Sequence, residues 1–226
     1  MRSLAFPSGA RAGFNAVHIA AGGIRFSGVA QSAGFLNLLN GKNGTNTGTP
    51  TVLIHGLLGP ATTYPSNSDY TTFTGGPSVT DTETTFAAIL VPNTLSGFQY
   101  YFSDSGGDAL GVNGNLYYIR FGGTSNDSGL TLTVGVPYFL AASANASAVN
   151  FAVMRLDNGK FVEATTASGT NLASTGTYRI ATVPGAGGSS GLASVAAAMK
   201  NSKFMPAAAL KQWAYDPWSF WYPTQT

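Results

Sequence analysis

Three short apolar runs in the stretch 134–165 constrain the fold more than any other part of the sequence. They cover residues 138–142, 149–156 and 161–162, and the last two are separated by the turn DNGK at 157–160. An Asn-Gly pair supplies the two positive-φ residues of a tight I′ turn, so this is the strongest hairpin signal in the chain. The stretch therefore predicts antiparallel β-structure.

The middle run is apolar on both faces. Phe151 and Val153 point to one side, and Ala152, Met154 and Leu156 point to the other. A strand of this kind is buried on both sides, as in the interior of a two-sheet antiparallel sandwich. Because the core would occupy both faces, we expect function to lie elsewhere, in the N-terminal segment, the loops and the C-terminal tail.

Similar short runs continue along the chain, with a turn signal about every ten residues, which is typical of a sandwich or barrel. The further predicted strands are 35–39, 52–58, 82–91, 98–102, 116–121, 130–134, 178–183 and 192–199. The last of these also fits helical spacing, and the surrounding Ser and Gly favour a strand. One short helix is predicted, beginning at Pro206 and ending before Pro217. The predicted fold class is therefore all-β, with a short C-terminal helix.

Two domain segments are predicted. Residues 1–34 are small and Gly-rich, and they form either an N-terminal arm or an ordinary first strand with a loop. Residues 35–226 form the β-domain. As an arm, the first segment would attach the domain to a partner, and its candidate contact residues are Phe14, His18, Arg25 and Phe26.

The composition excludes several classes of partner. Only 9% of residues are charged and 29 are glycine, a composition of turns and neutral β-surface. The 11 basic residues give a net charge of only +2 and form no cluster, so we expect no nucleic-acid partner. No apolar run reaches the roughly eighteen residues of a membrane span, and no signal peptide is visible before Pro7. The absence of cysteine excludes disulfides and thiolate chemistry.

The signals for catalysis are weak. The segment GGSSG at 187–191 has the spelling of a hydrolase nucleophile elbow, but both histidines, His18 and His55, lie far upstream of it. Glycosidases need two carboxyl groups, and the chain has two glutamates, Glu83 and Glu163, each in an alternating strand. Solvent-facing strand positions explain them more simply. We therefore expect no enzymatic activity.

The Gly-rich segment 104–113 contains hard oxygen ligands that suit calcium. Asp104, Asp108 and Asn113 are the candidates, although their spacing is not that of an EF-hand, and a plain polar loop explains them more simply. His18 and His55 lack further ligands for a zinc site. Calcium is thus the sole cofactor that the sequence suggests.

All three tryptophans lie close together in the C-terminal tail. The aromatic candidates there are Trp213, Tyr215, Trp218, Trp221 and Tyr222. Such residues could close the core, contact a neighbouring subunit, or stack against sugar rings, and the sequence leaves these three alternatives open.

The order of the phrases along the chain resembles the concanavalin A-like lectin and glucanase superfamily, specifically the laminin G-like modules of phages and prophages. The phrases are NLLNGKNGT at 37–45, the loop end at 64–73, TFAAILVP at 85–92, VPYFLAA at 136–142, the hairpin 151–162, the closing strand at 197–201, the helix PAAAL at 206–210 and DPW at 216–218. The resemblance covers most of the chain from about residue 35 onward.

This resemblance implies a jelly-roll sandwich of two curved antiparallel sheets. It also implies a non-enzymatic structural protein of the phage virion, as a capsid decoration or as a tail or fibre component, since the carboxylate cluster of the family's hydrolases is missing. The alternative is a carbohydrate-binding lectin module for cell-surface glycans. The expected partners are other virion proteins, further copies of the chain, or host-surface glycans, and the expected location is the virion.

Overall fold

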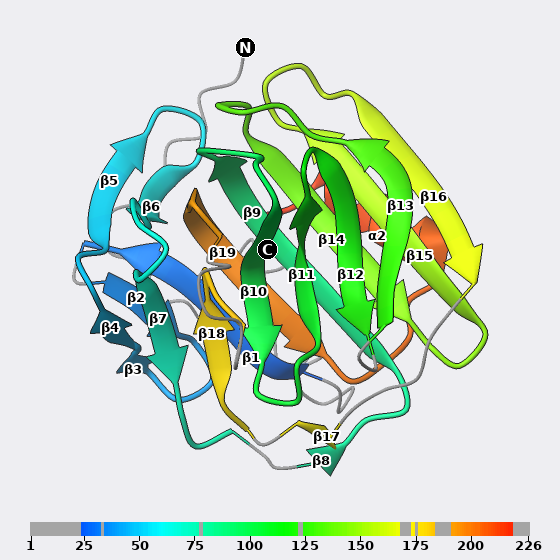
Figure 1. Cartoon of the computed structure of the whole chain (residues 1–226), viewed down its shortest axis with the longest axis horizontal. Helices are drawn as coiled ribbons and strands as arrows, with labels where there is room; N and C mark the ends of the chain where they lie inside the picture. Colours follow the sequence, from blue (N-terminus) through cyan, green and yellow to red (C-terminus); the bar gives the residue numbers. More distant parts are fainter. Residues whose placement is uncertain are drawn as a thin grey trace, which may run out of the picture.

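The structure of the protein is a computed structural model that describes residues 24–32, 34–76, 79–121, 124–167, 173–174, 176–183 and 191–218. Within these residues two antiparallel sheets pack face to face, and one short helix follows near the C-terminal end (Figure 1). The predicted all-β sandwich with a C-terminal helix is therefore confirmed. No helix in this part of the chain is long and apolar enough to cross a membrane.

The larger sheet contains ten of the described strands. Its path runs in the order β16 (Phe161–Ala167), β15 (Ala148–Arg155), β14 (Tyr138–Ala144), β9 (Thr84–Pro92), β19 (Ala193–Asn201), β1 (Ile24–Gln31), β2 (Gly34–Asn37) and β3 (Lys42–Asn43). Beside the start of β19 lies β6 (Gly59–Thr63), which pairs in turn with β5 (Thr51–His55).

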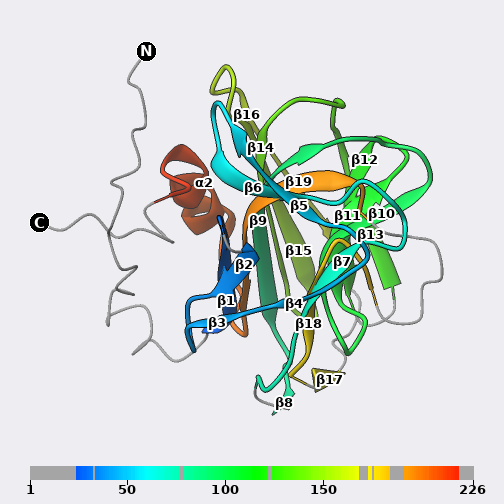
Figure 2. The ribbon, with the colours of Figure 1, turned by 90° about the vertical axis from the view of Figure 1, so that its left-hand side faces the viewer.

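The smaller sheet contains seven of the described strands. Their order is β13 (Thr124–Thr131), β12 (Leu116–Phe121), β11 (Ala109–Asn113), β10 (Phe98–Asp104), β18 (Tyr178–Ile180), β7 (Tyr70–Phe73) and β4 (Thr45–Thr47). The short strands β8 (Val79–Thr80) and β17 (Ala173–Ser174) form a separate ribbon. Helix α2 (Ala207–Tyr215) covers the face of the larger sheet that points away from the smaller one (Figure 2).

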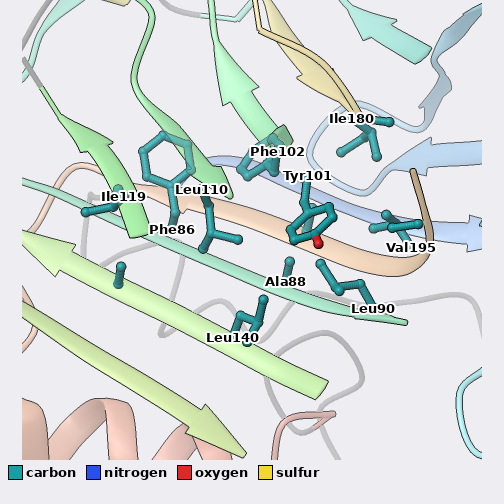
Figure 3. Packing of buried hydrophobic residues seen from close by; sticks show 14 of the residues in the cluster. Phe86, Ala88, Leu90, Tyr101, Phe102, Leu110, Ile119, Leu140, Ile180 and Val195 are labelled. Carbon is teal, nitrogen blue, oxygen red and sulfur yellow. The ribbon is translucent and has the colours of Figure 1, made fainter. Parts of the chain in front are cut away.

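Strand β9 faces two apolar cores, and all nine of its residues are buried. Phe86, Ala88 and Leu90 point into the main core between the sheets (Figure 3). Ala87 and Ile89 point the other way, into the second core beneath α2. The period of two in the sequence thus distributes one strand over two cores. Strand β15 follows the same pattern, which confirms that the middle run of 134–165 is buried on both faces.

The predicted hairpin at 157–160 is present, but the predicted I′ turn type is wrong. The pairing of β15 with β16 extends as far as Arg155, whose N–H donates a hydrogen bond to the Lys160 carbonyl at 2.9 Å. Gly159 has φ of 72°, whereas Asn158 is not among the described non-glycine residues with positive φ. A I′ turn needs positive φ at both central residues. The turn is therefore a longer loop, in which Asn158 Oδ1 accepts a hydrogen bond from the Lys160 N–H at 2.9 Å.

Four strands of the smaller sheet differ from the prediction, and two of them, β4 and β7, lie in segments where no strand was predicted. Strand β11 lies in the Gly-rich segment 104–113, for which a loop was predicted. It contains Gly111, where an added Cβ would lie 2.1 Å from the Gln99 carbonyl oxygen. The glycine permits the close approach of a bulge in β10. Strand β13 ends at Thr131, whereas residues 130–134 were predicted as strand. Its sequence is polar because it is an edge strand with an exposed face, so hydrophobic alternation does not mark it.

The first described residues belong to the sandwich. Strand β1 lies between β19 and β2 and pairs with both. Phe26 is completely buried, and its ring lies 4.9 Å from that of Phe73 and 5.2 Å from that of Phe102. Residues 24–31 therefore form a first strand of the domain rather than a detached arm.

Candidate functional site

The three calcium candidates are not brought together. Strands β10 and β11 form a hairpin, with Asp104 and Asp108 near its turn, whereas Asn113 lies opposite Phe98 at the far end. Four residue steps along a strand span about 13 Å, so Asn113 cannot share an ion with the two aspartates. Among the described residues, no group of three or more metal-ligating side chains is close enough to hold a metal ion.

Asp104 instead belongs to a buried ion network that joins the two sheets. Its carboxylate accepts a hydrogen bond from Lys200 Nζ on β19, and both side chains are fully buried. Lys200 Nζ also lies 3.8 Å from Asp81, which pairs with Arg25 at 3.0 Å. The Asp108 N–H donates to the Asp104 carboxylate at 3.1 Å. The cluster is a structural cross-link between β10 and β19.

The two glutamates lie too far apart for glycosidase chemistry. Glu163 pairs with Ala152, which pairs with Ala141, which pairs with Ala87. Three strand spacings amount to about 14 Å, and Glu83, which immediately precedes β9, lies four residues from Ala87, about 13 Å away. The backbone separation is therefore about 19 Å, whereas catalytic carboxyl pairs lie within roughly 5–10 Å of each other.

The remaining catalytic and metal candidates are only partly described. Of the segment 187–191, the structure describes Gly191 alone, and His18 lies outside the described residues. His55 ends β5, where its Nδ1 accepts a hydrogen bond from the Leu57 N–H at 3.3 Å.

The described attachment candidates belong to the domain itself. Phe14 and His18 lie outside the described residues. Arg25 pairs with the buried Asp81, and Phe26 is buried in the main core. Neither side chain has the exposure that attachment to a partner through an arm would require.

The aromatic tail is divided between core and surface. Trp213 and Trp218 are half-buried and pack against the second core, together with the buried Leu210 and Ala214 of α2. Tyr215 is 64% exposed, and its ring lies 5.8 Å from that of Phe161. Trp221 and Tyr222 lie outside the described residues.

An open groove lies where the edge strand of the smaller sheet approaches the edge strand of the larger one. It has a volume of about 270 Å³, close to the lower limit for small-molecule sites. Its lining residues come from β13 and the segment after it, from β14, and from β15, β16 and the turn between them: Gly129, Leu130, Thr131, Thr133, Tyr138, Val153, Arg155, Lys160 and Val162.

A bulge in β13 shapes one wall of the groove. Thr131 pairs with Leu116 and Asp127 pairs with Tyr118, so β13 spends four residue steps where β12 spends two. Gly129 has φ of 70°, which turns the chain within the bulge. The bulge lies where β13 contacts β16, and it places Gly129 and Thr131 in the lining of the groove.

The side of the groove formed by β14, β15 and β16 combines an apolar surface, the floor, with polar groups. Val153 and Val162 form a cross-strand pair on the floor. The Tyr138 hydroxyl accepts a hydrogen bond from the Thr133 N–H at 3.0 Å, which ties β14 to the segment after β13. Arg155 lies directly opposite Tyr138 in the β14–β15 register. A small polar molecule would find hydrogen-bonding groups around an apolar surface.

The groove carries an excess of positive charge. Arg155 and Lys160 both line it, and Arg155 donates two hydrogen bonds to Asp157, at 3.1 and 2.6 Å. The side-chain hydrogen bond from Arg155 lowers the pKa of Asp157, and the same bond raises the pKa of Arg155. The pair therefore stays ionised at neutral pH, and Lys160 adds a further positive charge.

This site is not among the sites predicted from the sequence, in which residues 157–160 indicate only a turn and residues 138–142 and 149–156 indicate only core strands. One signal was available: three of the six residues from 155 to 160 are charged, in a chain with 9% charged residues.

Comparisons with known proteins bear on the fold. No protein-family model and no curated protein matches the chain. Domain 4 of AbnA, a GH43 extracellular arabinanase from Geobacillus stearothermophilus solved in complex with arabinotriose, is similar with a TM-score of 0.59 and 13% identity. That match covers 84% of this chain and 98% of the arabinanase domain.

Two further structures are similar over part of their own length. A structure of botulinum neurotoxin type C, whose cell entry is dependent upon interaction with two ganglioside molecules, matches 88% of this chain and 52% of its own, with a TM-score of 0.60 and 8% identity. The enzymatically active domain of tailspike protein 2 from bacteriophage CBA120 matches 85% of this chain and 30% of its own, with a TM-score of 0.50 and 17% identity. By fold, the protein is a jelly-roll sandwich of two antiparallel sheets.

Proposed function

We propose that this chain is a carbohydrate-binding module and that the groove between β13 and the β15–β16 hairpin is its sugar site. The observation that carries the proposal is the composition of the groove, in which the Val153–Val162 floor is bordered by Tyr138, Arg155 and Lys160. Sugars offer an apolar ring face and a rim of hydroxyl groups, which suits such a lining. The same fold in the arabinanase domain was solved with arabinotriose, which supports a glycan ligand.

The proposed module is not catalytic. None of the described lining residues of the groove is a carboxylate, and the neighbouring Asp157 is held in its ion pair with Arg155. Glycoside hydrolysis needs one carboxyl group as acid and another as base or nucleophile. Binding without turnover is the function that this lining supports.

Replacing Lys160 or Arg155 by glutamine is expected to weaken glycan binding by about 10- to 100-fold, because hydrogen bonds from charged donors contribute about 1.5–3 kcal/mol. The ligand is first identified by screening the purified chain on a glycan array with and without calcium. Its dissociation constant is then measured for each variant by titration calorimetry. Both side chains are on the surface, so the variants are expected to retain the fold.

Lys211→Gln is the matched control, because Lys211 lies on α2, where its Nζ is 5.5 Å from the Phe161 ring centre. It removes the same charge outside the groove and is expected to leave affinity unchanged. Tyr215→Ala tests the exposed aromatic of the tail in the same way. Loss of binding in these two variants, with Lys160→Gln unaffected, would move the site to the tail. An array without any binding glycan would refute the module.

We also propose, as a second function, that the chain is a structural component of a phage virion, of the laminin G-like type that its sequence resembles. The likeness to a phage tailspike domain supports this proposal. The partners would then be other capsid, tail or fibre proteins, and glycan binding would serve contact with the host surface.

The virion proposal is tested in particles purified by density gradient from the phage that encodes the chain. Mass spectrometry is expected to detect the chain at several copies per particle, and the chain is expected to co-sediment with particles after a high-salt wash. The washed host lysate serves as the control for carry-over. A chain present in the lysate and absent from the particles would exclude a structural role.

A further inference from the structure

The β5–β6 hairpin exposes an unusual amount of apolar surface. Leu53 and Ile54 on β5 are 56% and 77% exposed, and Leu57 in the turn is 48% exposed. These are three of the seven large apolar side chains that are exposed among the described residues. In Figure 1, β5 lies at the rim of the sandwich. Apolar side chains gathered on one element indicate an interaction surface.

The backbone of β5 also has an open edge. Within the described residues β5 pairs only with β6, in a register that places Ile54 opposite Pro60 and Val52 opposite Thr62. Because proline has no N–H, Ile54 and Pro60 form a non-hydrogen-bonded pair, and so do Val52 and Thr62 two residues away. The N–H and C=O groups of Val52 and Ile54 therefore point away from β6, towards the open edge.

In the part of the chain that the structure describes, this edge lacks the charges and the proline that commonly protect an exposed strand. Natural edge strands are blocked by lysine, by proline or by charged side chains that point inward. No Asp, Glu, Lys or Arg occurs between Lys42 and Asp69, and the five residues of β5 contain no proline. An acidic or basic partner would find no opposite charge on this hairpin, whereas two copies of it can approach without charge repulsion.

We propose that β5 pairs antiparallel with β5 of a second copy of this chain, about a two-fold axis that passes through Leu53. In this register Val52 faces Ile54 of the partner subunit, and Ile54 faces Val52 of the partner subunit. These are the residues whose backbone groups point outward, so each of the two pairs exchanges two hydrogen bonds. Leu53 packs against its own symmetry mate, and the exposed apolar side chains are covered on both faces.

The register can be tested with single cysteines, because the natural chain contains none. Directly opposed residues of a non-hydrogen-bonded pair have Cα atoms about 4.5 Å apart, within the range that a disulfide can bridge. Leu53→Cys is therefore expected to form a covalent dimer on mild oxidation, as seen on a non-reducing gel. Ile54→Cys is the matched control, since the two copies of that residue are diagonal neighbours about 7–8 Å apart and should cross-link at least about tenfold more slowly.

The assembly is measured separately by sedimentation equilibrium of the full chain. Two chains of 23.2 kDa give an expected mass of 46.4 kDa for the wild type. Ile54→Lys places a charge on the open edge and is expected to reduce the mass to 23.2 kDa, with the circular dichroism spectrum unchanged because the side chain is exposed. Ile54→Val keeps the apolar edge and should keep the dimer.

Three outcomes would overturn the proposal: a wild-type chain that is monomeric at high concentration, an Ile54→Lys variant that assembles as the wild type does, or equal cross-linking of Leu53→Cys and Ile54→Cys. None of these measurements depends on glycan binding, so the proposal can fail while the groove binds sugar, or hold while it does not.

Discussion

Replacing Lys200 by methionine is expected to lower the free energy of unfolding by about 3–5 kcal/mol, because it leaves a buried carboxylate without its cation. Asp104 and Lys200 are both fully buried, and their ion pair joins β10 of the smaller sheet to β19 of the larger one. The Lys200 ammonium also lies 5.4 Å from the centre of the Phe86 ring. Methionine preserves the volume, so the loss reports on the charge. Urea unfolding at neutral pH measures it.

The double variant Lys200→Met, Asp104→Asn provides the control for this assignment. Asparagine can still accept the hydrogen bond from the Asp108 N–H, and the uncompensated charge is removed. We expect the double variant to be clearly more stable than Lys200→Met alone. Lys42→Met, on an exposed strand, should change stability by no more than about 0.5 kcal/mol. A Lys200→Met chain as stable as the wild type would show that the pair contributes nothing.

Phe26→Ala is expected to lower the free energy of unfolding by about 3–5 kcal/mol, because it removes a fully buried ring from the centre of the main core. The ring lies 4.9 Å from that of Phe73 and 5.2 Å from those of Phe102 and Tyr178. These neighbours come from three different strands of the smaller sheet, β7, β10 and β18, so the cavity cannot be closed by moving one strand. Urea unfolding again provides the measurement.

This variant distinguishes a first strand from an arm. Phenylalanine in a detached arm would contribute almost nothing to the stability of the domain. The matched comparison is Phe98→Ala at the start of β10, where the ring is 45% exposed and a much smaller loss is expected. If Phe26→Ala and Phe98→Ala lowered the free energy of unfolding by similarly small amounts, the placement of β1 in the sandwich would be contradicted.

The local pattern of apolar residues was sufficient to predict the strands whose two faces are buried in the two cores. The alternation in β9 assigns Phe86 to one core and Ala87 to the other, and the structure confirms it. The edge strand β13 is polar on its exposed face and so has no hydrophobic pattern of its own, whereas in β11 the glycine that its neighbour requires interrupts a short apolar run. Their positions follow from pairing with β12 and β10, which a local reading of the sequence does not contain.

The candidate site depends on contacts of the same long-range kind. Tyr138 and Arg155 look like parts of apolar strands, and Lys160 looks like part of a turn. They become one surface because the bulge around Gly129 brings β13 up to β16. The calcium candidates fail for the opposite reason: a segment read as one loop is a hairpin, whose pairing holds Asn113 at the far end from the two aspartates.

The positions of the groove and of β5 determine how strongly the proposed module could hold a surface. In Figure 1 the strands that border the groove and the open edge of β5 lie on opposite sides of the molecule. Pairing through β5 would therefore leave both grooves open, at the two far ends of the dimer. Two modest sites on one rigid body act at high effective concentration once the first has bound. Avidity would then let a shallow groove retain a densely glycosylated surface while releasing free sugars readily.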